Sequence, residues 1–242
     1  MDPAPADFQA AASAVAERAA GLIRPGMRLG LGTGRMASAL VMALGPRVKA
    51  GLAVQGICTS RATEDLARAA GIELISGSGE GLDLDLDGAD EFDSRLNALK
   101  GGGGALLREK IIAQRSRRLW LLVDASKEVD LLGSSHPLPV EVLPYDWEAT
   151  AARCEAGTGA KAALRGELEH PALTDNGNYL LDLTFPDGLI DPEAAGRALD
   201  AIAGVLGHGL FLGLATAAIL FKRGGVKILG DLDRERELLG AP

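Results

Sequence analysis

The stretch Gly30–Ser38, GLGTGRMAS, follows an apolar run and precedes a segment with helical spacing. A glycine-rich turn between a strand and a helix is typical of α/β proteins. Such a turn often receives a phosphate, because the N–H groups in the first turn of the helix have no partner within the helix. Glycines also serve simply to turn the chain. The stretch therefore predicts an α/β fold and leaves open whether the turn binds an anion.

Two nucleotide-binding motifs share this glycine-rich character, and the sequence fits neither. The dinucleotide fingerprint needs a third glycine and an acidic residue about twenty positions further on. Arg35 stands at the place of the third glycine, and residues 49–58 contain no acidic residue. A P-loop needs Gly-Lys-Ser or Gly-Lys-Thr, which occurs nowhere in the chain. If the turn binds an anion, we therefore expect a small phosphate or carboxylate.

Short apolar runs alternate with helical segments through the first half of the chain. After an amphipathic helix at residues 7–23, this alternation predicts a parallel, doubly wound sheet that binds ligands at the carboxyl ends of its strands. The strands are expected at 27–31, 52–58, 73–75, 82–86 and 119–123, and the helices at 34–44, 104–117 and from an N-cap at Thr59-Ser60 to about Gly71.

The pattern changes after Leu132. Strands expected at 138–143, 161–168, 179–185 and 205–211, with helices at 147–156 and 192–203, give the βαββαβ order of a ferredoxin-like domain. The apolar segment 214–229 is expected to rejoin the first sheet. We therefore expect a Rossmann-like domain over 1–132 and 207–242 and an inserted α+β domain over 133–206. Residues 174–178, TDNGN, predict a hairpin with a type I′ turn.

Composition narrows the class of protein. The formal net charge of −8 argues against a nucleic-acid-binding surface. The longest apolar run, 209–221, is too short to span a membrane. Acidic residues stand where a signal peptide would carry positive charge. Cys58 and Cys154 lie far apart and the three histidines are scattered, so we expect reduced thiols, no metal site and a cytoplasmic location.

The stretch Asp83–Asp93, DLDLDGADEFD, carries candidate catalytic carboxylates. Because aspartates alternate with leucines, Asp83 and Asp85 are interpreted as one solvated strand face. Asp87 differs, since it ends the strand and opens a turn that brings Asp90 and Glu91 close. Carboxylates at that end of a strand lie where doubly wound folds bind ligands.

The stretch 99–113, LKGGGGALLREKIIA, places Lys100 and four glycines before a helix. Ordering four glycines is costly, which indicates a backbone that approaches another group closely. On a helical wheel, Glu109 falls at the centre of the apolar arc of that helix. A buried carboxylate is either paired in a structural ion pair or has a pKa raised towards that of a general base. Lys127 is expected at the same edge of the sheet, just after the strand at 119–123. A base near a cation, without a metal, suits proton transfer next to a carbonyl, through an enediolate.

Six stretches resemble the ribose-5-phosphate isomerase type A family. In chain order they are GLGTG at 30–34, DGADE at 87–91, KGGGGALLREKIIA at 100–113, VDASK at 123–127, PLPVEVLP at 137–144 and DNGN at 175–178. The resemblance implies interconversion of ribose 5-phosphate and ribulose 5-phosphate in the pentose phosphate pathway. It also implies no metal or organic cofactor, a homodimer or homotetramer, and a Rossmann-like domain joined to a ferredoxin-like one.

Carried over residue by residue, the resemblance also implies roles. Glu109 is the base that moves a proton between C1 and C2, and Lys100 stabilises the enediolate charge. Asp87 and Asp90 assist ring opening and proton movement at the sugar oxygens. The implied substrate-binding residues are Thr33, Gly34, Arg35, Met36, Gly88, Ala89, Gly101, Gly102, Gly103 and Lys127.

Two places depart from the family's pattern. Arg35 and Met36 stand where the family usually has Ser and Thr, and residues 221–225 replace a Gly-Thr-Pro-Asp-Gly turn. The substrate is therefore less defined than the reaction. The alternatives are an isomerase of the same mechanism acting on another phosphosugar or sugar acid, a non-catalytic sugar-phosphate-binding protein, and a CoA-transferase-like enzyme with a glutamate nucleophile. Retention of Glu109, Lys100, Asp87 and Asp90 disfavours the non-catalytic alternative.

Overall fold

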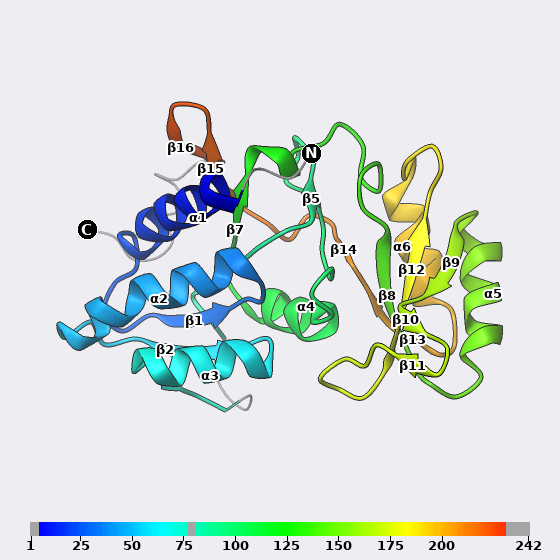
Figure 1. The fold of residues 1–242 in the computed structure, drawn as a ribbon, viewed down its shortest axis with the longest axis horizontal. Coiled ribbons are helices and arrows are strands. Elements are labelled where there is room, and N and C mark those ends of the chain that lie inside the picture. The colour runs from blue at the N-terminus through cyan, green and yellow to red at the C-terminus, as the bar shows by residue number, and fades with distance from the viewer. Residues whose placement is uncertain (1–4, 77–80, 231–242) are drawn as a thin grey trace. The chain divides into compact units, whose positions relative to one another are not determined.

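A seven-stranded sheet confirms the predicted doubly wound architecture (Figure 1). The computed structural model describes residues 5–76 and 81–230. The strands are β1 Arg28–Leu31, β2 Gln55–Cys58, β3 Glu73–Leu74, β4 Leu84–Asp87, β7 Leu119–Asp124, β15 Ala217–Lys222 and β16 Gly225–Leu229. Their order is β16-β15-β7-β4-β1-β2-β3, and all neighbours are parallel except β15 and β16. The order reverses direction between β1 and β4, which is where doubly wound sheets bind ligands.

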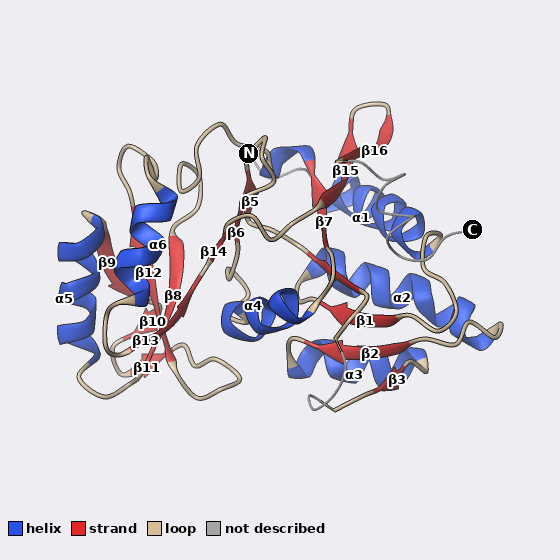
Figure 2. Ribbon diagram, turned by 180° about the vertical axis from the view of Figure 1, so that it is seen from behind, coloured by secondary structure: helices blue, strands red, loops and turns tan. Residues whose placement is uncertain are grey.

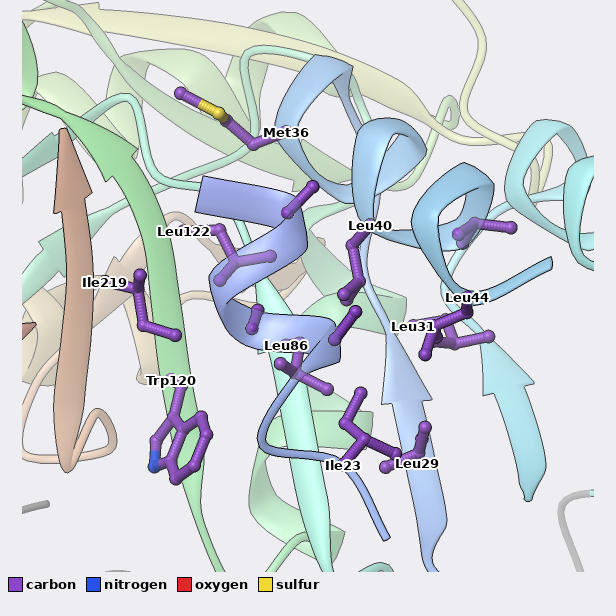
Figure 3. Packing of buried hydrophobic residues seen from close by; sticks show 14 of the residues in the cluster. Ile23, Leu29, Leu31, Met36, Leu40, Leu44, Leu86, Trp120, Leu122 and Ile219 are labelled. Atoms are coloured by element: carbon purple, nitrogen blue, oxygen red, sulfur yellow. The ribbon is translucent and has the colours of Figure 1, made fainter. Parts of the chain in front are cut away.

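Helices pack on both faces of this sheet. They are α1 Pro5–Ala20, α2 Arg35–Lys49, α3 Arg61–Ala70 and α4 Leu106–Arg115. Leu40 and Leu44 of α2 share one buried cluster with Leu86 of β4 (Figure 3). Side chains alternate along a strand, so Asp85 and Asp87 point to the opposite face of β4. That face is covered by α4, because a Cβ at Gly30 would overlap both Asp85 and Ile112 of α4.

This placement corrects one prediction. Asp85 is fully buried, whereas the alternation of aspartates and leucines predicts a solvated acidic strand face. The alternation rule assumes a strand with one face in water, but β4 pairs with β1 and β7 and is covered on both faces. Asp83, which precedes β4, is partly exposed and accepts a hydrogen bond from the Arg28 N–H at 2.8 Å.

The second half of the chain forms the predicted βαββαβ unit. Its elements are β8 Leu138–Val142, α5 Trp147–Thr158, β9 Lys161–Leu164, β12 Tyr179–Thr184, α6 Pro192–Asp200 and β13 Val205–His208. The antiparallel sheet has the order β13-β8-β12-β9, and α5 and α6 cover one of its faces (Figure 2). Asp191 caps α6, since its side chain accepts a hydrogen bond from the Ala194 N–H at 2.8 Å.

The short strands Glu91–Phe92, Ala98–Leu99 and His170–Pro171 were not predicted, whereas Gly166–Glu167 and Leu210–Phe211 lie within the strands expected at 161–168 and 205–211. A three-stranded sheet joins β5 Glu91–Phe92, β6 Ala98–Leu99 and β14 Leu210–Phe211, and a ribbon pairs β10 Gly166–Glu167 with β11 His170–Pro171. The strand expected at 205–211 therefore divides into β13 and β14. Gly209 lies between them, where a Cβ would overlap the carbonyl oxygen of Lys100.

The chain divides into two units. The first comprises Met1–Gly88, Arg108–Lys127 and Gly213–Pro242, and the second comprises Ala89–Leu107 and Glu128–Leu212. The expected ranges were 1–132 with 207–242 and 133–206, and the second unit therefore also contains residues 89–107, 128–132 and 207–212. Within it, β6 pairs with β5 and with β14. Parts of the expected ranges, residues 1–4, 77–80 and 231–242, lie outside the described residues.

The TDNGN stretch forms a hairpin, but its turn is not of type I′. Leu173 pairs with Tyr179, and the Gly177 N–H donates to the Thr174 carbonyl at 2.9 Å. A type I′ turn requires positive φ at both central residues, yet Gly177, at the last position of the turn, is the one residue of 174–178 with positive φ. The Asn176 side chain instead donates to Glu141 Oε1 at 3.0 Å, as do those of Thr174 and Asn178.

Candidate active site

Asp87 and the first glycine-rich turn meet at the carboxyl ends of β1 and β4. Asp87 is fully buried, and its Oδ1 accepts hydrogen bonds from the Thr33 N–H at 3.1 Å and the Gly88 N–H at 2.7 Å. A Cβ at Gly32 would overlap the Asp87 carboxylate. The glycine in this turn is therefore needed for close approach to the neighbouring strand, and three of the predicted site residues are brought together.

Hydroxyl groups from the end of β2 and from α3 support the same turn. The Thr33 and Thr59 hydroxyls lie 2.7 Å apart, and Thr63 Oγ1 donates to the Gly32 carbonyl at 2.9 Å. Ser60 caps α3 through the Thr63 N–H at 3.2 Å. The sequence indicated Thr59-Ser60 only as a helix N-cap. Both residues directly follow β2, which pairs with β1. This position is the signal that could have placed them beside the turn.

The N-terminus of α2 carries the residues that depart from the family pattern. Gly34 precedes the helix with φ of 102° and makes no side-chain cap. Arg35 is exposed, and its guanidinium carbon lies 3.8 Å from the centroid of the Phe8 ring, a distance typical of a cation–π contact. Met36 is buried in the cluster drawn in Figure 3. The Arg35 guanidinium therefore contacts α1 through the Phe8 ring.

Glu109 lies on the buried face of α4, as its place on the helical wheel predicts. Its side chain is 4% exposed, and its neighbours on that arc, Leu106, Ile112 and Ala113, are also buried. It belongs to the first turn of the helix, where the helix dipole favours a carboxylate. Lys127 lies further along the chain, at the end of the 3-10 turn Ala125–Lys127 that follows β7.

In the second unit, Asp90 and the four-glycine loop are hydrogen-bonded to each other. The Asp90 N–H donates to the Leu99 carbonyl at 2.9 Å, and Asp90 Oδ2 accepts from the Gly102 N–H at 2.7 Å. A Cβ at Gly102 would lie 2.7 Å from Asp90 Oδ1. Close approach of backbone to carboxylate therefore accounts for glycine at this position. Ala89 precedes Asp90 and Gly103 follows Gly102, so the second unit also holds these predicted residues.

Lys100 is the buried cation of this unit. Its side chain is 3% exposed, and its Nζ lies 5.3 Å from the centroid of the Phe211 ring. The Lys100 N–H donates to the Gly209 carbonyl at 2.8 Å. The Lys100 backbone is thus fixed on the β14 side immediately before the glycines begin.

Glu91, next to Asp90, has a structural role that the sequence did not reveal. It is fully buried and accepts backbone hydrogen bonds from Gly133, Ser135 and His136 at 2.5, 2.6 and 2.7 Å. A carboxylate that accepts three N–H bonds is well stabilised when buried. Glu91 therefore anchors the strand that begins directly after Asp90 to the loop 133–136.

The two cysteines are poor nucleophiles. Burial raises the pKa of the Cys58 thiol to about 12, with a further contribution from Glu64, and burial raises that of Cys154 to about 11. The thiolate is the reactive form, so at pH 8 iodoacetamide is expected to label the native protein far more slowly than the guanidinium-unfolded protein. Equal labelling rates in both states would contradict these shifts.

The raised pKa of Cys58 also predicts that the folded protein becomes less stable at high pH. The pKa of Cys58 in the folded protein lies above the ordinary thiol value of 9.0, so the folded state binds the thiol proton more tightly than the unfolded state. Its contribution to stability is therefore complete below about pH 9 and is lost as the pH rises towards about 12.

Within residues 5–76 and 81–230, the structure holds no group of three or more His, Cys, Asp or Glu side chains placed to bind a metal ion. None of the helices in this part of the chain is long and apolar enough to cross a membrane.

Comparison with known proteins gives a consistent family. Residues 55–225 match the family model described as ribose 5-phosphate isomerase A (phosphoriboisomerase A). The chain is 48% identical to ribose-5-phosphate isomerase A of Methylorubrum extorquens, over 90% of this chain and 97% of that protein. The Bacillus mycoides protein of the same name is 42% identical, over 87% of this chain and 95% of its own length.

Comparison with solved structures points to the same family. Ribose 5-phosphate isomerase A from Methanocaldococcus jannaschii superposes with a TM-score of 0.86 at 32% identity, covering 92% of this chain and 99% of that one. A D-ribose-5-phosphate isomerase in complex with phospho-erythronic acid superposes with a TM-score of 0.87 at 36% identity, with the same coverage.

Proposed function

This chain belongs to the ribose 5-phosphate isomerase A family, and we propose how its residues interconvert D-ribose 5-phosphate and D-ribulose 5-phosphate. The reaction is an aldose–ketose isomerisation, a step of the pentose phosphate pathway. The observation that carries the proposal is Glu109, a carboxyl side chain 4% exposed on the apolar face of α4. A base held away from water is suited to taking a proton from carbon.

Glu109 removes the proton from C2 of the open-chain aldose, and the electron pair moves onto O1 to give an enediolate. The same carboxyl group then returns a proton to C1, while the proton on O2 is transferred to O1, so that C2 becomes the ketone carbon and C1 carries the hydroxyl group. One proton leaves carbon and one returns, so aldose and ketose differ only in the position of the carbonyl. No redox partner is needed.

Lys100 stabilises the negative charge of the enediolate oxygen. A cation already buried and fixed by its backbone does not need to reorganise when the charge forms, which is the main source of such stabilisation. Asp87 and Asp90 assist opening of the sugar ring and movement of protons between its oxygens. The backbone fixes both carboxylates, since each accepts an N–H hydrogen bond at 2.7 Å.

The remaining predicted residues bind the substrate. Gly101, Gly102 and Gly103 line it, and Gly88 and Ala89 contribute backbone beside the two aspartates. Thr33, Gly34, Met36 and Lys127 bind chiefly the phosphate, Met36 through its backbone N–H because its side chain lies in the core. Arg35 supplies a strong donor where the family usually has two hydroxyls.

An isomerase assay with a panel of aldose phosphates tests this function. Ribose 5-phosphate is expected to be turned over with the highest kcat/KM among aldopentose and aldohexose phosphates. Higher kcat/KM for another phosphosugar would instead favour the alternative substrate class that Arg35 and Met36 suggest.

Arg35→Met is expected to raise the KM for ribose 5-phosphate by about 10- to 100-fold with little change in kcat. The reason is the loss of a charge-assisted hydrogen bond to phosphate, worth about 1.5–3 kcal/mol. Arg47→Met, in the last turn of the same helix, removes the same charge and serves as the control. Activity on unphosphorylated ribose should be equally low in all three proteins, and an unchanged KM in Arg35→Met would remove Arg35 from the phosphate site.

We further propose that the enzyme acts in the cytoplasm as a homodimer or homotetramer. Support comes from the resemblance to the family and from its place in central carbohydrate metabolism. Sedimentation equilibrium of the purified protein tests the oligomeric state.

A further inference from the structure

We propose that Arg165 is a positioning residue for Asp90, acting through the peptide group between Gly101 and Gly102. Arg165 Nη1 donates to the Gly101 carbonyl at 3.0 Å and to the Gly102 carbonyl at 3.1 Å. The N–H of the same Gly101–Gly102 peptide group donates to Asp90 Oδ2 at 2.7 Å. One peptide group thus links the guanidinium to the carboxylate. The inference rests on the proposed function, since Asp90 matters only if it assists the reaction.

Two hydrogen bonds to Asp182 fix the orientation of the Arg165 guanidinium. Its Nε donates to Asp182 Oδ2 at 2.9 Å, and its Nη2 donates to Asp182 Oδ1 at 2.5 Å. This paired contact occupies one edge of the planar guanidinium and leaves Nη1 aimed at the glycine loop. The two side chains are 21% and 23% exposed, so the pair is shielded from much of the solvent screening that weakens surface ion pairs.

The strand register explains why this pair faces the loop. Leu181 and Leu183 of β12 lie in the core between the sheet and its helices, so Leu180 and Asp182 point to the opposite face. The glycine loop lies against that face, because a Cβ at Gly104 would be 3.3 Å from Leu180 Cδ1. Arg165 directly follows β9, and its N–H donates to the Leu180 carbonyl at 2.8 Å.

The planar peptide makes this link directional. In a trans peptide the C=O and N–H bonds point in opposite directions and cannot rotate separately, and the described residues contain no cis peptide bond. Holding the Gly101 oxygen therefore aims the Gly102 N–H. A cationic donor on the oxygen also polarises the N–H, which strengthens its bond to the carboxylate.

A loop of four glycines needs such a restraint. Glycine loses more conformational freedom on ordering than any other residue, and Gly101 already adopts φ of 107°. Without Arg165 the two carbonyls lose their shared donor, and the loop samples other orientations of the Gly102 N–H. We therefore expect Arg165 to act on the rate of reaction rather than on substrate binding.

Kinetics of Arg165→Met and Arg165→Lys test the proposal. Both variants are expected to lose about 10- to 100-fold in kcat, the scale of a small misplacement of a reacting group, with KM within about twofold. Lysine is not expected to rescue, because a single ammonium cannot reproduce the fork that reaches Asp182 and both carbonyls. Asp182→Asn keeps the side-chain volume and is expected to lower kcat by a smaller factor than the Arg165 variants do.

Arg68→Met is the matched control, since Arg68 forms an exposed ion pair with Glu64 at 2.6 Å. Its kcat should equal that of the wild type. Should Arg165→Met fail to fold, Arg165→Lys and Asp182→Asn carry the test. Wild-type kcat in a folded Arg165→Lys protein, or a loss confined to KM, would overturn the positioning role.

Amide hydrogen exchange at Gly102 provides a readout without substrate. Loss of the guanidinium is expected to speed exchange at Gly102 at least tenfold, whereas Arg68→Met leaves it unchanged. If the wild type failed to isomerise any aldose phosphate, the proposed function would fail while the exchange result still measured the link. Unchanged exchange in folded Arg165 variants would overturn the inference even in an active enzyme.

Discussion

Glu109→Gln is expected to lower kcat for ribose 5-phosphate by about 10²- to 10⁴-fold, the usual contribution of a general base. Glutamine has almost the same shape as glutamate, so it fits the same buried position on α4. Its amide cannot accept a proton from carbon. The measurement is a steady-state assay of ribulose 5-phosphate formation, in which KM should change far less than kcat.

Glu64→Gln is the matched control for this variant. Glu64 also lies in the first turn of its helix, α3, but on an exposed surface. It should retain wild-type kcat, and the Glu109→Gln protein should melt as a folded protein. A folded Glu109→Gln enzyme with kcat within threefold of the wild type would remove Glu109 from the mechanism.

Lys100→Met is expected to lower kcat by about 10²- to 10³-fold, the size of effect seen when one donor to a developing oxyanion is removed. Methionine keeps the apolar stem, which packs where Lys100 is 3% exposed. The positive charge is lost, so the enediolate loses its stabilisation while the ground state loses little. The effect should therefore appear in kcat rather than in KM.

Lys161→Met controls for the loss of one positive charge in the same unit, because Lys161 is an exposed residue at the start of β9. It should leave kcat unchanged. If Lys100→Met raised KM alone, Lys100 would bind the substrate without acting on the transition state.

Much of the fold could be predicted because its signals are local. Alternating short apolar runs and capped helices predicted the sheet of the first unit, and the βαββαβ order predicted the second. Asp87 could be placed because a residue that ends a strand of a parallel sheet lies at the ligand-binding edge. The burial of Glu109 followed from helical spacing alone.

Other features depend on contacts between distant segments. The burial of Asp85 depends on the strands and helices that cover β4. The strands β5, β6 and β14 are two residues each, too short to show any periodicity. The Asn-Gly turn takes another form where the Asn176 side chain bonds to Glu141. Arg165 contacts the Gly101 carbonyl across 64 residues of sequence, and no local pattern marks it.

Isomerisation of ribose 5-phosphate in D₂O tests the central claim most directly. While a carboxyl group holds the proton taken from C2, that proton exchanges with solvent, so part of the ribulose 5-phosphate should carry deuterium at C1. Proton NMR at low conversion measures this label. We expect deuterium at C1 with the wild type and no detectable labelled product over the same period with Glu109→Gln. Labelled product formed at the wild-type rate by a folded Glu109→Gln protein would contradict the assignment of Glu109 as the base.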